Sequence, residues 1–109
     1  MISGVGVDIQ NLSSFDITDD KFIERVLSEN ELMIYNQINN DKRKLEFLAG
    51  RFCAKEAIFK AYGKQQKGCF LEIEILMDEA GRPVANDEHI KVSIAHSNDN
   101  AISFATYEK

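Results

Sequence analysis

The chain has 109 residues, a length typical of one domain that buries a single modest core. Hydrophobic residues make up 44% and charged residues 28%, and no apolar run approaches the roughly 20 residues that a membrane helix needs. The net charge of −5 argues against a general nucleic-acid binder, because contacts with phosphates require a basic surface. We therefore expect one soluble domain over residues 1–109, with neither a membrane nor a nucleic acid as partner.

The first residues and the two cysteines both indicate a cytoplasmic protein. The chain starts without a basic segment ahead of an apolar stretch, so it lacks the build of a secretory signal. Cys53 and Cys69 are sixteen residues apart, a spacing that matches no zinc or redox motif. We expect both thiols to be reduced and to pack as small, partly buried hydrophobes.

Positive charge is concentrated in the middle of the chain. Residues 21–70 hold ten basic and six acidic side chains, whereas residues 1–20 hold four acidic ones and no Lys or Arg. This distribution suits a small phosphorylated ligand or an acidic protein partner better than a nucleic-acid polymer. Lys64 and Lys67, on a loop near the end of this region, either meet a ligand phosphate or belong to a solvated turn.

The first third of the chain predicts one strand and two short helices. Residues 2–9 are rich in Ile, Val and Gly and predict a β-strand, which places Asp8 near a strand end. After a loop rich in Ser and Asp, Thr18 or Asp19 is expected to cap a short helix. Ser28 and Glu31 then match a capping box, which predicts the start of a second helix.

The longest predicted helix runs from about residue 42 to residue 62. Gly63 follows it at the position where a left-handed cap is favoured. Large apolar residues recur along one side of this helix and predict its buried stripe: Leu45, Leu48, Phe52 and Phe59. At 100° per residue, Glu56 lies about 40° and Lys60 about 80° from Phe52 around the helix. Both side chains therefore border the buried face and can reach the edge of a common pocket.

The last third of the chain alternates between apolar and polar residues. Residues 71–75 predict a half-buried strand, and residues 78–83 predict a turn. Residues 90–94 and 101–107 alternate again, and the polar segment 96–100 between them predicts a hairpin connection. The fold class expected from these elements is α+β, with an antiparallel sheet packed against the long central helix and the shorter helices.

Three apolar segments each carry a polar side chain suited to chemistry. Taken singly, Asp8 is interpreted as a carboxylate that begins a turn. His96 is interpreted as a loop residue or as a buried imidazole whose hydrogen bonds are all made within the core. Glu56 with Lys60 is interpreted as a surface pair that stabilises the helix by about 0.2–0.5 kcal/mol. Taken together, two carboxylates suit a hard cation such as Mg²⁺, which shares its remaining positions with substrate phosphate oxygens. A neighbouring lysine would then contact the phosphate of the substrate.

Four segments of the chain resemble holo-[acyl-carrier-protein] synthases, the small type of 4′-phosphopantetheinyl transferase. They are Gly-Val-Asp-Ile at 6–9, Phe-Ile-Glu-Arg-Val-Leu-Ser-Glu-Asn-Glu at 22–31, Glu-Phe-Leu-Ala-Gly-Arg-Phe-Cys-Ala-Lys-Glu-Ala-Ile-Phe-Lys-Ala-Tyr-Gly at 46–63 and Val-Ser-Ile-Ala-His-Ser at 92–97. Their order and spacing and the length of the chain agree with that family. Each motif alone is only moderately specific for this family, whereas the four motifs in this order are strong evidence for the resemblance.

The resemblance implies Mg²⁺-dependent transfer of 4′-phosphopantetheine from coenzyme A to a serine of apo acyl carrier protein, in fatty acid biosynthesis. Adenosine 3′,5′-bisphosphate is the implied second product. Asp8 and Glu56 would bind the metal, and Lys60 would stabilise or protonate the leaving phosphate. Glu56, directly or through a water, is the candidate acceptor of the serine proton, with Asp8 as the alternative.

The resemblance also implies contacts with coenzyme A and a homotrimer with its sites between subunits. His96, Ser97, Lys55, Gly63 and Lys64 are the implied coenzyme A contacts, beside Lys60. Such a trimer would leave only part of each site on one chain.

The chain departs from the family pattern in three places. Gln10 and Ser14 stand where family members often carry an acid and an arginine that meets the acidic carrier. Lys21, Arg25 and the basic run at 42–44 are the substitutes for carrier binding. The Gly-Thr-Gly turn usual after the central helix is replaced by residues 64–67, which alters the nucleotide contacts.

Two other hypotheses accompany the transferase. The first is a non-catalytic trimeric module that binds coenzyme A or an acidic helical partner through the basic middle third. The second is purely structural, with Glu56 and Lys60 as a surface pair and Asp8 as a cap. Mg²⁺ dependence separates the transferase from the binding module, and the distances among the three side chains test the structural hypothesis.

Overall fold

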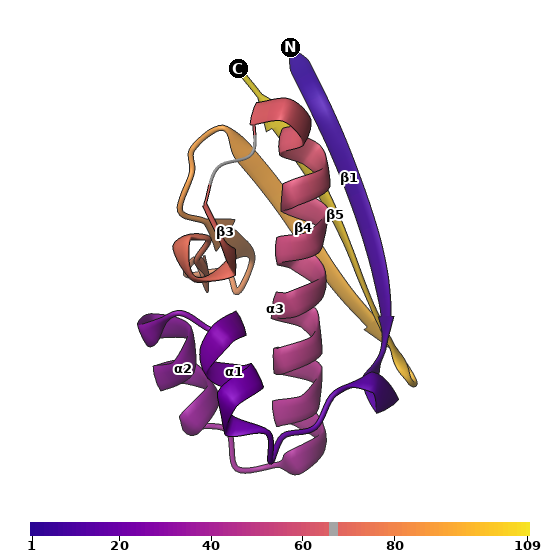
Figure 1. Ribbon diagram of the computed structural model, residues 1–109, viewed down its shortest axis with the longest axis vertical. Coiled ribbons are helices and arrows are strands. Elements are labelled where there is room, and N and C mark those ends of the chain that lie inside the picture. The colour runs from indigo at the N-terminus through magenta and orange to yellow at the C-terminus, as the bar shows by residue number, and fades with distance from the viewer. Residues whose placement is uncertain (66–67) are drawn as a thin grey trace.

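A computed structural model describes residues 1–65 and 68–109 of the chain, and its fold is α+β as expected. The long helix α3 (Asp41–Tyr62) lies across a three-stranded sheet, with β1 (Ile2–Asn11), β5 (Asn100–Glu108) and β4 (Ile90–Ser97) side by side in that order (Figure 1). Both strand pairs are antiparallel, and β4 and β5 form the predicted hairpin, but its connection is only residues 98–99 and not 96–100, because His96 and Ser97 still pair with β5. No helix among the described residues is long and apolar enough to cross a membrane.

Helix α3 packs on the sheet through small residues rather than through the large apolar stripe expected from the sequence. Ala57 and Cys53 are completely buried, whereas Phe52 is only half-buried. A Cβ added at Gly6 of β1 would lie 1.9 Å from the carbonyl oxygen of Ala57, and Gly4 meets Ala61 in the same way. The helix and the strand can therefore approach this closely only because both faces are small.

The larger side chains of α3 serve a second core on the side away from the sheet. There Leu48 is buried against Ile23 and Val26 of α1 (Asp20–Val26) and Tyr35 of α2 (Glu29–Asn36), with Phe52 packed at its edge. The two short helices begin as expected, with the Asp19 carboxylate accepting from a backbone N–H and with a complete Ser28–Glu31 capping box.

Residues 71–75 are not the strand that their alternation predicts. Residues Phe70–Glu72 form a 3₁₀ helix (η3), and only Ile75–Met77 (β2) pair, with Pro83–Ala85 (β3). The alternation arises instead because Ile73 and Ile75 are buried in the core while Glu72 is exposed. The predicted turn is present, since the Asp78 carboxylate accepts from the backbone N–H groups of Ala80 and Arg82.

Two further 3₁₀ turns complete the chain: η1 (Leu12–Ser14) continues β1, and η2 (Gly63–Gln65) continues α3. Gly63 has a φ of 56°, and its N–H donates to the carbonyl of Phe59, so it caps α3 with positive φ as expected. Its ψ of −121° lies outside the left-handed helical region. Of the two cysteines, Cys53 is buried, whereas Cys69 is exposed rather than partly buried.

Candidate active site

Strand β1 turns Asp8 toward helix α3. Side chains alternate along a strand, so Gly4, Gly6 and Asp8 share the inward face while Val5 and Val7 face outward and are more than half exposed. The strand continues to Asn11, which places Asp8 inside the strand and not near its end as expected. The small residues before it let its carboxylate come close to the helix.

Lys60 of α3 meets Asp8 directly. The Lys60 ammonium lies 3.2 Å from the Asp8 Oδ1 and donates to the carbonyl oxygen of Val7 at 2.9 Å. The Gln10 amide donates to the other carboxylate oxygen of Asp8, Oδ2, at 2.8 Å. The Lys60 side chain is about half exposed, so a ligand can reach its ammonium from solvent.

Glu56 lies one helical turn before Lys60 and belongs to the same cluster. Burial raises the pKa of Glu56, the negative charge of Asp8 raises it further, and Lys60 opposes both effects. Asp8 and Glu56 are thus close enough to repel each other. The structure brings together the three side chains that the sequence predicted, which disfavours the hypothesis of a cap and an unrelated surface pair.

Two neighbouring carboxylates, such as those of Asp8 and Glu56, suit a hard divalent cation. A cation between Asp8 and Glu56 would remove the repulsion that raises the pKa of Glu56. Among residues 1–65 and 68–109, no group of three or more His, Cys, Asp and Glu side chains is arranged to hold a metal ion. Oxygen atoms of the substrate and water would therefore have to complete the coordination.

Cys53 is a neighbour of this cluster that the sequence did not single out. Its thiol donates to the backbone carbonyl of Asp8 at 3.0 Å, and burial raises the pKa of Cys53 to about 12. The thiol is therefore neutral at physiological pH and fixes the strand against the helix. It is unsuited to act as a nucleophile. Its position three residues before Glu56 was the only sequence signal for this role.

A groove of about 340 Å³ opens between the start of β1 and the end of α3. Lys60, Gly63 and Lys64 line it, as does Lys109, which the sequence did not indicate. Three lysines around one groove favour a phosphorylated ligand. The prediction for Lys67 falls outside the described residues.

Lys55 does not face this groove, contrary to the coenzyme A contact expected for it. Its side chain is completely buried, and its ammonium donates to the Glu31 carboxylate at 2.6 Å and to the backbone carbonyls of Val26 and Phe70. All three N–H groups have internal partners, so none is available to a ligand. Lys55 has a structural role because it points into the core between α3, α2 and the 3₁₀ helix η3.

His96 and Ser97 lie at the end of β4, apart from the carboxylate cluster. Strand β5 separates them from β1, so His96 is about 10 Å from that strand across the sheet. The His96 Nε2 lies 2.9 Å from the carbonyl oxygen of Glu46, which can only accept, so this nitrogen donates and Nδ1 can accept a hydrogen bond. Gly50 makes room, since a Cβ there would lie 3.0 Å from the imidazole.

Comparisons with known proteins agree with this architecture. The model of the 4′-phosphopantetheinyl transferase superfamily matches residues 4–105. A holo-[acyl-carrier-protein] synthase of Geobacillus sp. (strain WCH70) is 42% identical over all of this chain and 98% of its own length. One from Staphylococcus saprophyticus is 41% identical over 94% of this chain and 95% of its own.

Solved structures extend the likeness to three dimensions. The holo-(acyl-carrier-protein) synthase of Bacillus anthracis, in complex with CoA (3′,5′-ADP), superposes with a TM-score of 0.88 at 40% identity and covers 100% of this chain and 98% of that one. The Neisseria meningitidis enzyme has a TM-score of 0.86 at 29% identity over the full length of both chains. With its carboxylates and lysines on the same framework, the chain belongs to the holo-[acyl-carrier-protein] synthase family of enzymes, within the 4′-phosphopantetheinyl transferase superfamily.

Proposed function

We propose that this protein transfers 4′-phosphopantetheine from coenzyme A to a serine of apo acyl carrier protein, with Mg²⁺, in fatty acid biosynthesis. The products are the holo carrier and adenosine 3′,5′-bisphosphate. One observation carries the proposal: Asp8, Glu56 and Lys60 converge beside a groove lined by lysines in a chain of this family. Both cysteines are free, which agrees with a reducing compartment such as the cytoplasm.

In this proposal, Asp8 and Glu56 would hold Mg²⁺, and the ion would neutralise negative charge on the pyrophosphate. The serine oxygen forms a bond to the phosphorus next to pantetheine, and the bond from that phosphorus to the oxygen of the nucleotide phosphate breaks. Lys60 stabilises or protonates that leaving oxygen. Its partly exposed ammonium and the adjoining cationic groove support this role.

Glu56 is the proposed acceptor of the serine proton, directly or through a water. Burial first and Asp8 second raise the pKa of Glu56 while no cation is bound, and a cation held by both carboxylates would counter this rise. Asp8 is the alternative base, but both its carboxylate oxygens already accept hydrogen bonds, from Lys60 and Gln10. A substrate hydroxyl would therefore have to compete with these two donors for the carboxylate oxygens of Asp8.

The nucleotide end of coenzyme A is proposed to lie in the cationic groove, against Lys60, Gly63 and Lys64. His96 and Ser97 are proposed to contact coenzyme A across a subunit boundary, since β5 separates them from the cluster of their own chain. Lys21 and Arg25 of the first helix are the proposed contacts for the acidic carrier, together with the basic run at 42–44.

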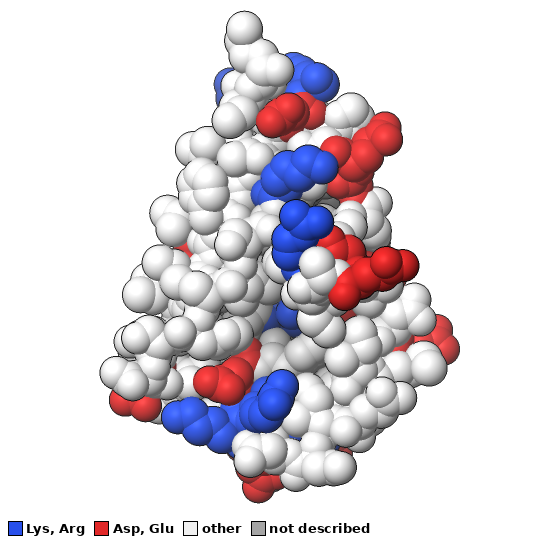
Figure 2. Space-filling view, turned by 180° about the vertical axis from the view of Figure 1, so that it is seen from behind, with Lys and Arg blue, Asp and Glu red and all other residues white. Residues whose placement is uncertain are grey.

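We propose a homotrimer assembled through the outer face of the sheet. Val5, Val7, Ile9, Ile102 and Phe104 point outward from β1 and β5, and each is between 42% and 62% exposed. Figure 2 shows an area without charged side chains on the side where β1 and β5 lie. An apolar patch of this kind is rare on a monomer and marks an interaction surface.

Phe104→Lys is expected to dissociate this assembly, because it places a charge in the centre of the apolar face. Sedimentation velocity should show the trimer for the wild type and the monomer for the variant. The transfer activity of the variant should also fall, because the proposed site spans two chains. Met33→Lys is the matched control, since Met33 is 59% exposed on α2, outside this face. A Phe104→Lys protein that sediments like the wild type would contradict the proposed interface.

Intact mass of apo acyl carrier protein tests the function. Incubation with this protein, coenzyme A and Mg²⁺ should add the mass of one phosphopantetheine to the carrier, and an excess of chelator should prevent the addition. A folded, trimeric protein that binds coenzyme A but modifies none of several carriers would instead support the non-catalytic binding module.

A further inference from the structure

The two short helices enclose a pocket that no step of the proposed reaction uses. Its volume is about 170 Å³, and its lining residues all come from α1 and α2. They are Asp20, Ile23, Glu24, Leu32, Tyr35 and Asn36. None of them belongs to the carboxylate cluster or to the lysine groove. This α1–α2 pocket is therefore a separate candidate site.

The Tyr35 hydroxyl is buried and has no hydrogen-bond partner among residues 1–65 and 68–109. The whole residue is only 4% exposed. A buried polar group without a partner is rare in a folded protein, because burial removes its hydrogen bonds to water. Burial raises the pKa of Tyr35, and the charges of Asp20 and Asp41 raise it further. Because Asp20 lines the α1–α2 pocket, the hydroxyl lies on the side of the ring that faces this pocket.

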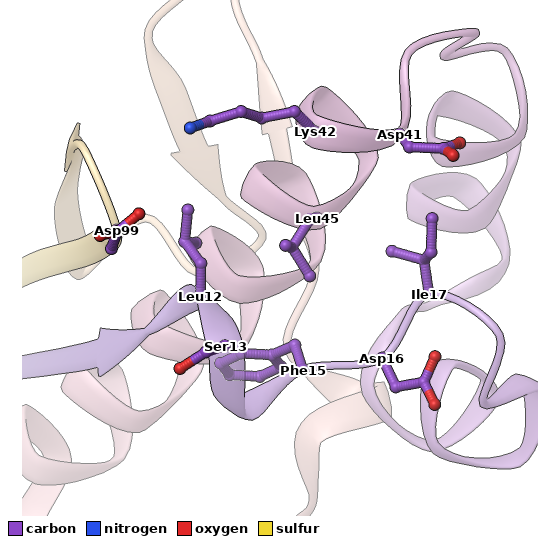
Figure 3. A pocket seen from close by; sticks show the side chains of 9 residues that line it. All are labelled: Leu12, Ser13, Phe15, Asp16, Ile17, Asp41, Lys42, Leu45 and Asp99. Atoms are coloured by element: carbon purple, nitrogen blue, oxygen red, sulfur yellow. The ribbon is translucent and has the colours of Figure 1, made fainter.

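Negative charge surrounds this hydroxyl from more than one helix. Asp20 and Glu24 are four residues apart, so they lie on the same side of α1, where like charges repel each other. Within the described part of the chain, neither carboxylate makes an ion pair. Figure 3, which draws the neighbouring pocket at the start of α3, shows the Asp41 side chain pointing away from Leu45 and toward the short helices. The surroundings of the Tyr35 hydroxyl therefore favour a cation.

One cation of the chain already lies near Tyr35, but not in the pocket. The Lys44 ammonium lies 4.6 Å from the centre of the Tyr35 ring, over its face, and Lys44 is not a lining residue. It stabilises the ring by a cation–π contact and leaves the hydroxyl without a partner.

The α1–α2 pocket suits an organic cation better than a metal ion. No group of three or more His, Cys, Asp and Glu side chains in the described ranges is arranged to hold a metal. A primary ammonium has three N–H donors, and Asp20, Glu24 and the Tyr35 hydroxyl can each accept one. Ile23 and Leu32 supply apolar surface for an alkyl stem. The volume is about that of five or six water molecules, room for an ammonium with a stem of about four carbons.

We propose that the α1–α2 pocket binds a primary alkylammonium group, whose nitrogen donates to Asp20, Glu24 and the Tyr35 hydroxyl. Such a group comes either from a free diamine or from a lysine side chain of another protein. Both carboxylates are exposed at the rim, so salt screens them and the affinity should fall as the ionic strength rises. The bound group would join α1 to α2 and so stabilise the helix pair.

Titration of the isotope-labelled full chain with 1,4-diaminobutane, followed by NMR, tests the site. We expect a Kd of about 1 mM at low ionic strength, with shifts confined to α1, α2 and the start of α3. Glu24→Gln and Tyr35→Phe should each weaken binding by about tenfold, because each removes one acceptor of the ammonium. Glu79→Gln removes the same charge at an exposed turn outside the pocket and is the matched control, which should bind like the wild type.

Two further ligands separate charge from shape and identify the source. 1-Butanol has a similar stem without the charge and should not bind measurably. A blocked lysine, Nα-acetyl-lysine amide, that binds as tightly as the diamine would assign the pocket to a protein side chain, whereas tighter binding of the diamine would assign it to the free amine.

The stability of Tyr35→Phe is a second test, because it removes a hydroxyl that has no partner in the free protein. Without ligand, its free energy of unfolding should equal or exceed that of the wild type, and only the stabilisation by the diamine should be lost. The inference is overturned if the wild type binds neither amine, if 1-butanol binds as well as the diamine, or if Glu24→Gln and Tyr35→Phe bind the diamine like the wild type.

Discussion

Replacing Glu56 by Gln is expected to lower kcat for carrier modification by at least about a hundredfold. The amide keeps the shape of the side chain but loses both the charge that binds Mg²⁺ and the capacity to accept the serine proton. Asp8→Asn should lower kcat comparably and raise the Mg²⁺ concentration required for half-maximal rate. Both effects are measured from the rate of mass gain of the carrier over a series of Mg²⁺ concentrations.

The stability of the Glu56→Gln protein distinguishes a lost function from a lost fold. The pKa of Glu56 is raised in the folded state, first by burial and then by Asp8. Its charged form therefore disfavours folding above that pKa, and removing the charge should leave the free energy of unfolding unchanged or higher at neutral pH. Glu46→Gln, on the same helix, is the matched control and should retain activity. Undiminished turnover in both Glu56→Gln and Asp8→Asn would refute the site assignment.

Lys55→Met is expected to destabilise the fold by about 3–5 kcal/mol, because it leaves the Glu31 carboxylate buried without its ion-pair partner. Glu31 is completely buried and also accepts from the backbone N–H groups of Ser28 and Ile75, so one carboxylate joins α2, α3 and β2. Urea unfolding measures the loss directly.

Lys64→Met is the control, since Lys64 is exposed and should change stability little. If Lys55 is structural, the fraction of the Lys55→Met protein that remains folded at low temperature should bind coenzyme A with the wild-type affinity. A variant with unchanged stability and weakened coenzyme A binding would restore Lys55 to the ligand site. The additional change Glu31→Gln should recover part of the lost stability, because it removes the unpaired charge.

The sequence by itself was sufficient for those features that depend on near neighbours. The capping box of Ser28 and Glu31, the extent of α3 and the β4–β5 hairpin each depend on residues a few positions apart, and all were predicted. The i, i+4 spacing of Glu56 and Lys60 also predicted a shared edge of the helix. Their partnership with Asp8 followed from charge types, from apolar context and from family resemblance.

Only the tertiary structure decided which charged residue joins the carboxylate cluster and which is buried in the core. Lys55 and Glu56 are adjacent in the sequence, yet Lys55 turns inward to Glu31, 24 residues away, while Glu56 turns toward Asp8, 48 residues away. Likewise, the alternation at 71–75 does not make a strand of that length, because residues 70–72 form a 3₁₀ helix and the Glu74 N–H donates to the side chain of Asn86, 12 residues away. Periodicity reports burial, but the partner of a buried polar group comes from a distant segment, so only packing in three dimensions identifies it.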